Sequence, residues 1–166
     1  MLQEKQNRSL ASGRWLGLDV GSVSLNLVVL DNRGEIEVEK YIRLHGQPLS
    51  TVFRELNRLK MEVDCSRLGG VGLTGMAGKM LAGLLGAPAF NEIIALSRGC
   101  HHLVPSARTL IDIGGEDAKA IFFQFVGQQR QAIIQDFAMN TICAAGTGSF
   151  LDQQASRLGL KIEELG

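Results

Sequence analysis

The chain has 166 residues, with 17 Lys and Arg against 17 Asp and Glu, and 45% of its residues are hydrophobic. The length allows one domain or two small ones, and this hydrophobic fraction excludes a disordered chain. The balanced charge argues against a nucleic-acid binder and against a polybasic membrane binder.

The first half of the chain is expected to form a small α/β unit. Short apolar runs predict buried strands, and apolar residues at even spacing predict the half-exposed strand at 36–42. Pro48 followed by apolar residues at a 3.6-residue period predicts a helix. Asp31–Gly34 is a hairpin turn between the second and third strands. In chain order we expect strands at 15–20, 24–30, 36–42 and 68–73, a helix at 48–63, a glycine-rich helical stretch from Gly75 and a helix at 91–103.

The second half begins at Arg108 and opens in the same way as the first. We expect strands at 109–113, 118–126 and 131–137, and then a helix that begins near Gly148. The apolar side of this last helix is formed by Phe150, Leu151, Ala155 and Leu158.

An internal repeat relates the two halves. When the chain is shifted by 93 residues, Asp19 meets Asp112 and Gly21 meets Gly114, while the turn residue Gly34 meets a glycine at 127. Any two hairpins share apolar strands and turn glycines. A match of the acid and both glycines in one register favours duplication.

Each copy places an aspartate at the end of a buried strand, with glycine close behind it. The two turns are Asp19–Ser22 (DVGS) and Asp112–Gly115 (DIGG). Backbone N–H groups beside glycine suit phosphate oxygens, and a carboxylate across the gap suits a hydrated Mg²⁺. One such turn is most simply structural, but a pair predicts a clamp for a polyphosphate. Glycine is enriched accordingly, with 20 of 166 residues against a usual share of roughly 7%.

The three cysteines, Cys65, Cys100 and Cys143, form no CxxC pair. The first twelve residues have no apolar core of a signal peptide, and the most apolar stretch, 75–90, carries Lys79 and is too short to span a bilayer. We therefore expect a cytoplasmic protein with reduced thiols and without membrane association.

Two longer strings resemble one family: IDIGGEDAK at 111–119 and NTICAAGTGSFLD at 140–152. Together with the duplicated turns, they resemble the BadF/BadG/BcrA/BcrD-type ATPases of the actin, hexokinase and heat-shock chaperone superfamily, from about Trp15 onward. That family comprises activators of 2-hydroxyacyl-CoA dehydratases and ATPase subunits of benzoyl-CoA reductases. The resemblance implies an actin-like α/β fold built of ribonuclease-H-like lobes. It also implies ATP hydrolysis that drives electron transfer from a 4Fe–4S cluster to a partner enzyme.

The resemblance further implies roles for individual residues. Asp19 and Asp112 would be catalytic and would serve Mg²⁺, through water, and the attacking water molecule. Cys143 would ligate a cluster shared across a homodimer, and its place just before a helix favours a thiolate. Phosphate would contact the two turns and the start of the last helix, at Gly21, Ser22, Gly114, Gly115, Gly146, Thr147 and Gly148.

The sequence departs from the family pattern in four respects. Glu116 stands where the family usually has Gln, and Thr141 and Ile142 stand where it usually has Asp-Lys. The family's second cluster cysteine and its adenosine-binding glycine turn are absent from the 166 residues.

These absences lead us to expect the N-terminal part of a longer protein. We expect a tail at 1–13, a first lobe at 14–105 and the first part of an incomplete second lobe at 106–166. The cluster is expected only in the full-length dimer. The chain alone is expected to hydrolyse ATP weakly or not at all, and to expose apolar surface on its second sheet.

Two other patterns are most simply structural. Residues 72–80 resemble a Walker A loop, but Leu73 replaces the leading glycine and Met80 replaces the Ser or Thr that would bind Mg²⁺. Cys100, His101 and His102 are neighbours on a helix, so their side chains point apart and cannot share one ion. Cys65, like Cys100, is expected to be an ordinary thiol.

Three functions remain open from the sequence. The leading one is an ATPase activator that binds ATP and ADP and works with a low-potential electron donor and an acyl-CoA dehydratase or reductase component. The alternatives are a small-metabolite kinase of the same superfamily and a non-catalytic nucleotide-sensing module. Cys143 favours the first, since a kinase has no use for a cysteine at that helix start.

Overall fold

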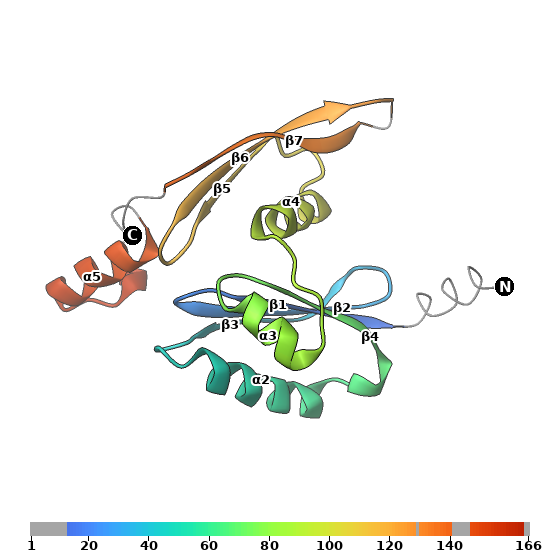
Figure 1. The fold of residues 1–166 in the computed structure, drawn as a ribbon. Coiled ribbons are helices and arrows are strands. Elements are labelled where there is room, and N and C mark those ends of the chain that lie inside the picture. The colour runs from blue at the N-terminus through green and yellow to red at the C-terminus, as the bar shows by residue number, and fades with distance from the viewer. Residues whose placement is uncertain (1–12, 129, 141–146, 165–166) are drawn as a thin grey trace. The chain divides into compact units, whose positions relative to one another are not determined.

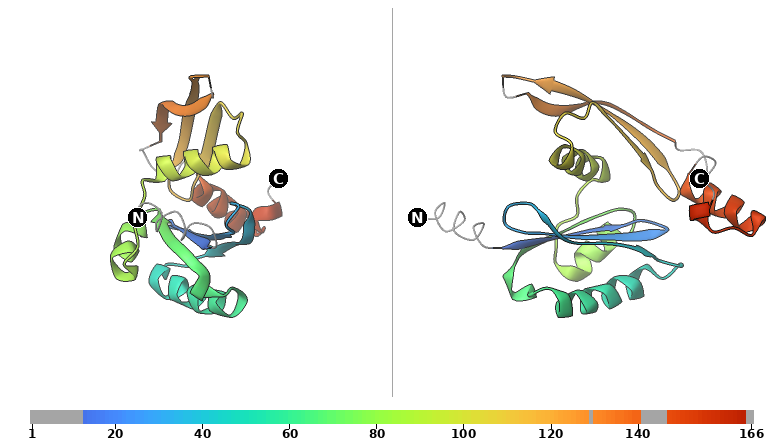
Figure 2. Two further views of the ribbon diagram at one scale, coloured as in Figure 1. Left: turned by 90° about the vertical axis from the view of Figure 1, so that its right-hand side faces the viewer. Right: turned by 180° about the vertical axis from the view of Figure 1, so that it is seen from behind.

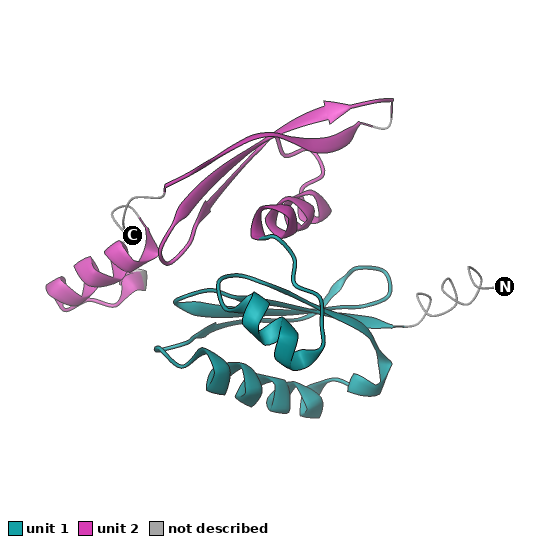
Figure 3. Ribbon diagram, in the orientation of Figure 1, with its two compact units in different colours: residues 1–91 teal, residues 92–166 magenta. Residues whose placement is uncertain are grey.

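A computed structural model describes residues 13–128, 130–140 and 147–164. The chain divides into two compact units, residues 1–91 and 92–166 (Figure 3). Each unit combines helices with its own sheet, which confirms the predicted α/β class. The lobe boundary expected near Pro105 falls inside the second unit, and the division of the whole protein into lobes stays a prediction.

The first unit is a four-stranded sheet with two helices on one face (Figures 1 and 2). The strand order is β3-β2-β1-β4, in which β4 runs parallel to β1 and the other neighbours are antiparallel. Its elements are β1 (Arg14–Val20), β2 (Ser24–Leu30), β3 (Ile36–Arg43), α2 (Pro48–Glu62), a 3-10 helix (Cys65–Arg67), β4 (Leu68–Thr74) and α3 (Gly78–Leu85).

Alternate residues of the strands form the core of this unit. Leu18 lies opposite Leu27 in the β1–β2 ladder, and both are buried. The predicted helix is confirmed, with Pro48 in its first turn and with Val52 and Leu59 buried against the sheet. Burial of this apolar face holds the four strands and the two helices together.

Several glycines of the sheet make room for aromatic rings on the opposite face. A Cβ on Gly70 would lie 2.6 Å from the ring of Trp15, and one on Gly72 would lie 2.9 Å from the ring of Phe90. The same face carries an apolar groove of about 550 Å³. Part of the glycine enrichment is therefore explained by packing and not by a ligand.

The second unit is a three-stranded antiparallel sheet of order β5-β6-β7, with α4 against one face (Figure 1). His101 of α4 lies edge-on to Phe123 of β6, with ring centroids 4.3 Å apart. The elements are α4 (Glu92–Leu103), β5 (Thr109–Ile113), β6 (Ala118–Val126), β7 (Gln131–Met139), α5 (Gly148–Leu158) and a 3-10 helix (Ile162–Glu164). No helix among the described residues is long and apolar enough to cross a bilayer.

The predicted repeat has a structural counterpart in the register of the two hairpins. Leu18 pairs with Leu27 across β1 and β2, and Ile111 pairs with Ala120 across β5 and β6. Both residues of the second pair lie 93 positions after those of the first. The two hairpins are therefore equivalent residue by residue.

The repeat also explains why apolar surface is exposed in the second unit. Leu18 and Val20 are buried under α2 and α3, whereas their equivalents Ile111 and Ile113 are 69% and 60% exposed. The predicted exposure on the second sheet is thus confirmed in the described part of the chain. The apolar side expected for α5 is likewise open, because Phe150, Leu151 and Leu158 are exposed and Ala155 is the buried residue of that helix.

Candidate functional site

In the first unit the candidate site lies at the carboxyl end of β1. Asp19 pairs with Asn26 in the β1–β2 ladder, and the Asn26 Nδ2 group donates to Asp19 Oδ2 over 3.2 Å. The Gly21 N–H donates to the Ser24 carbonyl over 3.0 Å and closes the turn that contains Ser22. The Gly21 N–H therefore has its acceptor within the turn, and contact of Gly21 or Ser22 with phosphate stays a prediction.

Gly75 belongs to this site, although the sequence indicated only the start of a helix there. The helix α3 begins three residues later, and Gly75 has a left-handed backbone with φ of 85°. A Cβ on Gly75 would lie 2.5 Å from Asp19 Oδ1 and 2.6 Å from the Val20 carbonyl oxygen. The pairing of Asp19 with Thr74 across parallel strands creates this approach, and sequence periodicity does not report pairing between distant strands.

Replacing Gly75 by Ala is expected to destabilise the chain by at least about 2 kcal/mol, since the methyl group meets backbone and the φ is strained. Thermal unfolding measures this loss. Gly83→Ala is the matched control, because Gly83 lies in α3 with nothing near its Cβ position. There we expect a gain of about 0.5–1 kcal/mol. Equal effects of the two variants would contradict the assigned role of Gly75.

The equivalent site of the second unit is built around a buried cation. Asp112 of β5 pairs with Lys119 of β6, and the Lys119 side chain is only 2% exposed. The Lys119 Nζ lies 2.5 Å from Asp117 Oδ1, 2.9 Å from Glu92 Oε1 and 3.5 Å from Asp112 Oδ2. One oxygen from each of the three carboxylates lies within 4.8 Å of the others, and such oxygen donors suit a hard cation.

Lys119 is held in its charged form. Burial opposes the ammonium charge, but hydrogen bonds to Asp117 and Glu92 outweigh burial and raise the pKa of Lys119. The sequence contained Lys119 within a family string but indicated no role for it. The alignment of the two halves could have indicated a role, because a shift of 93 residues aligns Lys119 with Asn26, the partner of Asp19.

The start of α5 lies against the Gly114–Gly115 turn. The Gly148 N–H donates to the Gly114 carbonyl over 2.9 Å, and the Thr147 hydroxyl donates to the Gly115 carbonyl over 3.1 Å. The Gly114 N–H itself donates to the Asp117 carbonyl over 2.9 Å, which repeats the bond of Gly21. Thr147 and Gly148 are therefore brought to the predicted site, where their donors support the turn.

Contact of Gly115 with phosphate stays a prediction. The other two residues predicted near this turn, Gly146 and Cys143, lie outside the described residues.

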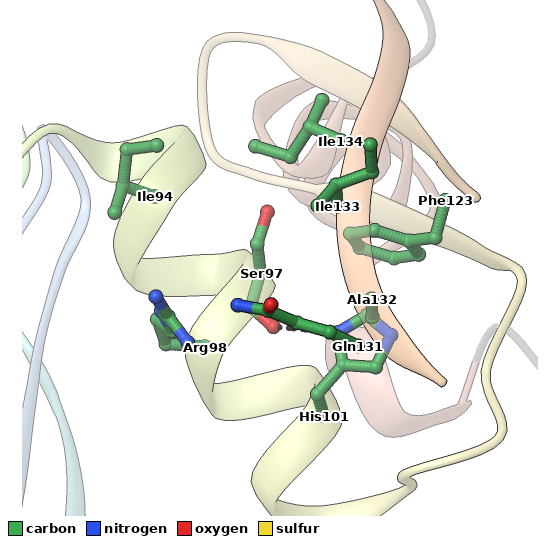
Figure 4. Close-up of a pocket in the computed structure, with 9 residues that line it drawn as sticks. All are labelled: Ile94, Ser97, Arg98, His101, Phe123, Gln131, Ala132, Ile133 and Ile134. Carbon is green, nitrogen blue, oxygen red and sulfur yellow. Dashed lines mark hydrogen bonds between the residues drawn. The ribbon is translucent and has the colours of Figure 1, made fainter. Parts of the chain in front are cut away.

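A second cavity, of about 300 Å³, lies between α4 and β7 (Figure 4). His101 faces it with Nδ1 3.0 Å from the Ser97 carbonyl and Nε2 3.2 Å from the Ala107 carbonyl. His101 therefore contacts backbone carbonyl groups as well as the Phe123 ring, which gives it a packing role. Cys65 and Cys100 are half-buried free thiols.

Known proteins match nearly the whole chain. Residues 16–166 match the family described as the BadF/BadG/BcrA/BcrD ATPase family. The chain is 36% identical over 151 residues to the activator of lactoyl-CoA dehydratase of Anaerotignum propionicum, which covers 90% of this chain and 56% of that protein.

Two solved structures have the same fold. The activator of the 2-hydroxyisocaproyl-CoA dehydratase from Clostridium difficile, with bound ADPNP, matches with a TM-score of 0.75 and 32% identity over 92% of this chain and 55% of its own. The (R)-2-hydroxyglutaryl-CoA dehydratase component A of Acidaminococcus fermentans matches with a TM-score of 0.77 and 30% identity. That match covers 93% of this chain and 57% of the component A chain. The predicted actin-like α/β fold is confirmed by these matches. The chain spans about half the length of these relatives.

Proposed function

The chain belongs to the BadF/BadG/BcrA/BcrD ATPase family, and on this basis we propose that the full-length protein is an ATP-hydrolysing activator. It couples ATP to electron transfer from a 4Fe–4S cluster to a partner of the 2-hydroxyacyl-CoA dehydratase or benzoyl-CoA reductase type. It works in the cytoplasm as a homodimer and receives electrons from a low-potential donor.

The proposal is supported chiefly by the pair of equivalent aspartate turns. Asp19 and Asp112 occupy the same register position in duplicated hairpins, and each has a partner that holds one carboxylate oxygen. A relative of the same fold binds ADPNP. Two carboxylate turns of this kind fit the two sides of a polyphosphate with its metal ion.

The chain's own residues do mostly positional work, as is usual in phosphoryl transfer. Ser22 and Gly115 would offer turn amides to phosphate oxygens, while Asp19 and Asp112 would hold water molecules of a hydrated Mg²⁺ and orient the attacking water. When bound, Mg²⁺ neutralises charge that develops on the phosphate.

Substitution of Gly21 tests whether a ligand approaches this turn closely, without disrupting the fold. A Cβ on Gly21 would lie 3.5 Å from the Ser24 carbonyl oxygen, an ordinary contact. Gly21→Ala should therefore leave the free energy of unfolding within about 1 kcal/mol of wild type. We expect it to weaken MgATP binding at least about 10-fold, because the methyl group occupies the path of the phosphate.

Calorimetric titration of the full-length protein measures that affinity. Gly99→Ala serves as control, since Gly99 lies in α4 with open space around its Cβ position. Wild-type affinity in Gly21→Ala would remove this turn from the nucleotide site.

The cluster assignment depends on Cys143, which lies in the family string CAAGTG outside the described residues. Iron and sulfide analysis of the full-length protein, purified without oxygen, tests it. We expect stoichiometric iron and sulfide in the dimer. A metal-free dimer that transfers the γ-phosphate of ATP to a small metabolite would instead support the kinase alternative.

A further inference from the structure

Lys119 is a buried cation to which neither the family pattern nor the proposed chemistry assigns a role. It lies on β6, the central strand of its sheet, and its side chain is 2% exposed. Its three carboxylate partners come from different elements. Asp112 lies on β5, Asp117 lies in the turn before β6, and Glu92 is the first residue of α4.

The Lys119 ammonium group is important because of the negative charges around it. One positive charge faces three carboxylates whose oxygens lie within 4.8 Å of one another. Three like charges at this distance repel strongly wherever water is partly excluded. Lys119 is therefore the group that keeps Asp112, Asp117 and Glu92 together in one arrangement.

The duplicated hairpin of the first unit shows the contrast. At the position equivalent to Lys119 it has Asn26, whose neutral amide holds Asp19 through one hydrogen bond of 3.2 Å. Asp112 instead faces a charged donor that is itself fixed by two further carboxylates. The repeat thus keeps the aspartate in both halves but changes the group that holds it.

We propose that Lys119 is a positioning residue that fixes the Asp112 carboxylate and links the Gly114–Gly115 turn, through Glu92, to the start of α4. Asp112 Oδ2 lies 3.5 Å from the ammonium, and Glu92 Oε1 lies 2.9 Å from it. Since Glu92 begins α4, the same cation anchors that helix to the strand that carries Asp112. This inference rests on the proposed ATPase function.

Lys119→Met alone leaves three uncompensated carboxylates and is expected to unfold the second unit at a lower temperature. The decisive variant is therefore Lys119→Met combined with Asp117→Asn, which keeps the cluster's net charge and removes the cation that faces Asp112. We expect this double variant of the full-length protein to fold. Its kcat for ATP hydrolysis should fall about 10- to 100-fold, while its KM for ATP stays within about threefold of wild type.

Lys40→Met is the matched control, because Lys40 forms a more exposed ion pair with Glu62 over 2.6 Å in the first unit. We expect it to leave kcat and KM unchanged. The role of Lys119 would be overturned by any of three results for the double variant. These are a wild-type kcat, a loss of ATP affinity without a loss of kcat, and a failure to fold. Wild-type protein without any ATP hydrolysis would overturn the proposed function itself, and so the two failures are distinguishable.

Discussion

Replacing Asp112 by Asn is expected to lower ATP turnover by the full-length protein about 10²–10⁴-fold while nucleotide binding stays largely intact. The amide has nearly the same shape as the carboxylate but carries no charge, so it neither orients the attacking water nor holds water on Mg²⁺. The change also removes one of the three negative charges around Lys119 and should not unfold the second unit.

Steady-state phosphate release and nucleotide titration separate these two effects. Asp136→Asn is the matched control, because Asp136 lies exposed on β7 of the same sheet and accepts a hydrogen bond from the adjacent Phe137 N–H. We expect that control to turn over ATP at the wild-type rate. Unchanged turnover in Asp112→Asn would remove this carboxylate from the mechanism.

Replacing Cys143 by Ser is expected to remove the iron–sulfur cluster from the full-length protein while the fold remains. A hydroxyl group is a poor ligand for iron in a cluster, and in the proposed dimer each subunit would supply few thiolates to the shared cluster. Iron and sulfide analysis after purification without oxygen measures the loss, and the visible absorbance of the cluster should disappear with it.

The two other cysteines provide the controls for this measurement. Cys65 and Cys100 are half-buried free thiols in the described structure, and their replacement by Ser should leave the iron content unchanged. Iron retained in Cys143→Ser would refute the ligand assignment. Iron lost from either control would point to a less specific cause.

The strands and helices could be predicted because local patterns determine them. Apolar alternation marked the strands, and Pro48 and the 3.6-residue period marked α2. The equivalence of the two hairpins also followed from the 93-residue repeat, and the structure shows it in their matching registers. The hairpin glycines Gly34 and Gly127 both have left-handed backbones, with φ of 85° and 70°.

The environment of Lys119 could not be predicted from local pattern. A lysine in an apolar strand is normally exposed, and the pattern alone gives no reason to bury it. Its burial depends on Glu92, which lies on a helix earlier in the chain, and on the tertiary packing of that helix against the sheet. Such pairings arise between elements, where sequence periodicity carries no information.

The roles of the glycines were only partly predictable. Gly21 and Gly114 lie in the aspartate turns as expected, but their N–H groups bond within the turns. Gly70 and Gly72 accommodate aromatic rings, and Gly75 approaches Asp19. A high glycine content indicates that other groups approach the backbone closely. Which groups these are depends on which strands lie side by side.

We propose that the two aspartate turns hold MgATP for hydrolysis. Release of inorganic phosphate from ATP by the full-length protein, measured with and without Mg²⁺ and with no acceptor present, tests this claim. We expect steady phosphate release that stops when Mg²⁺ is chelated. Absence of phosphate release in the presence of Mg²⁺, or a rate that chelation leaves unchanged, would contradict the claim.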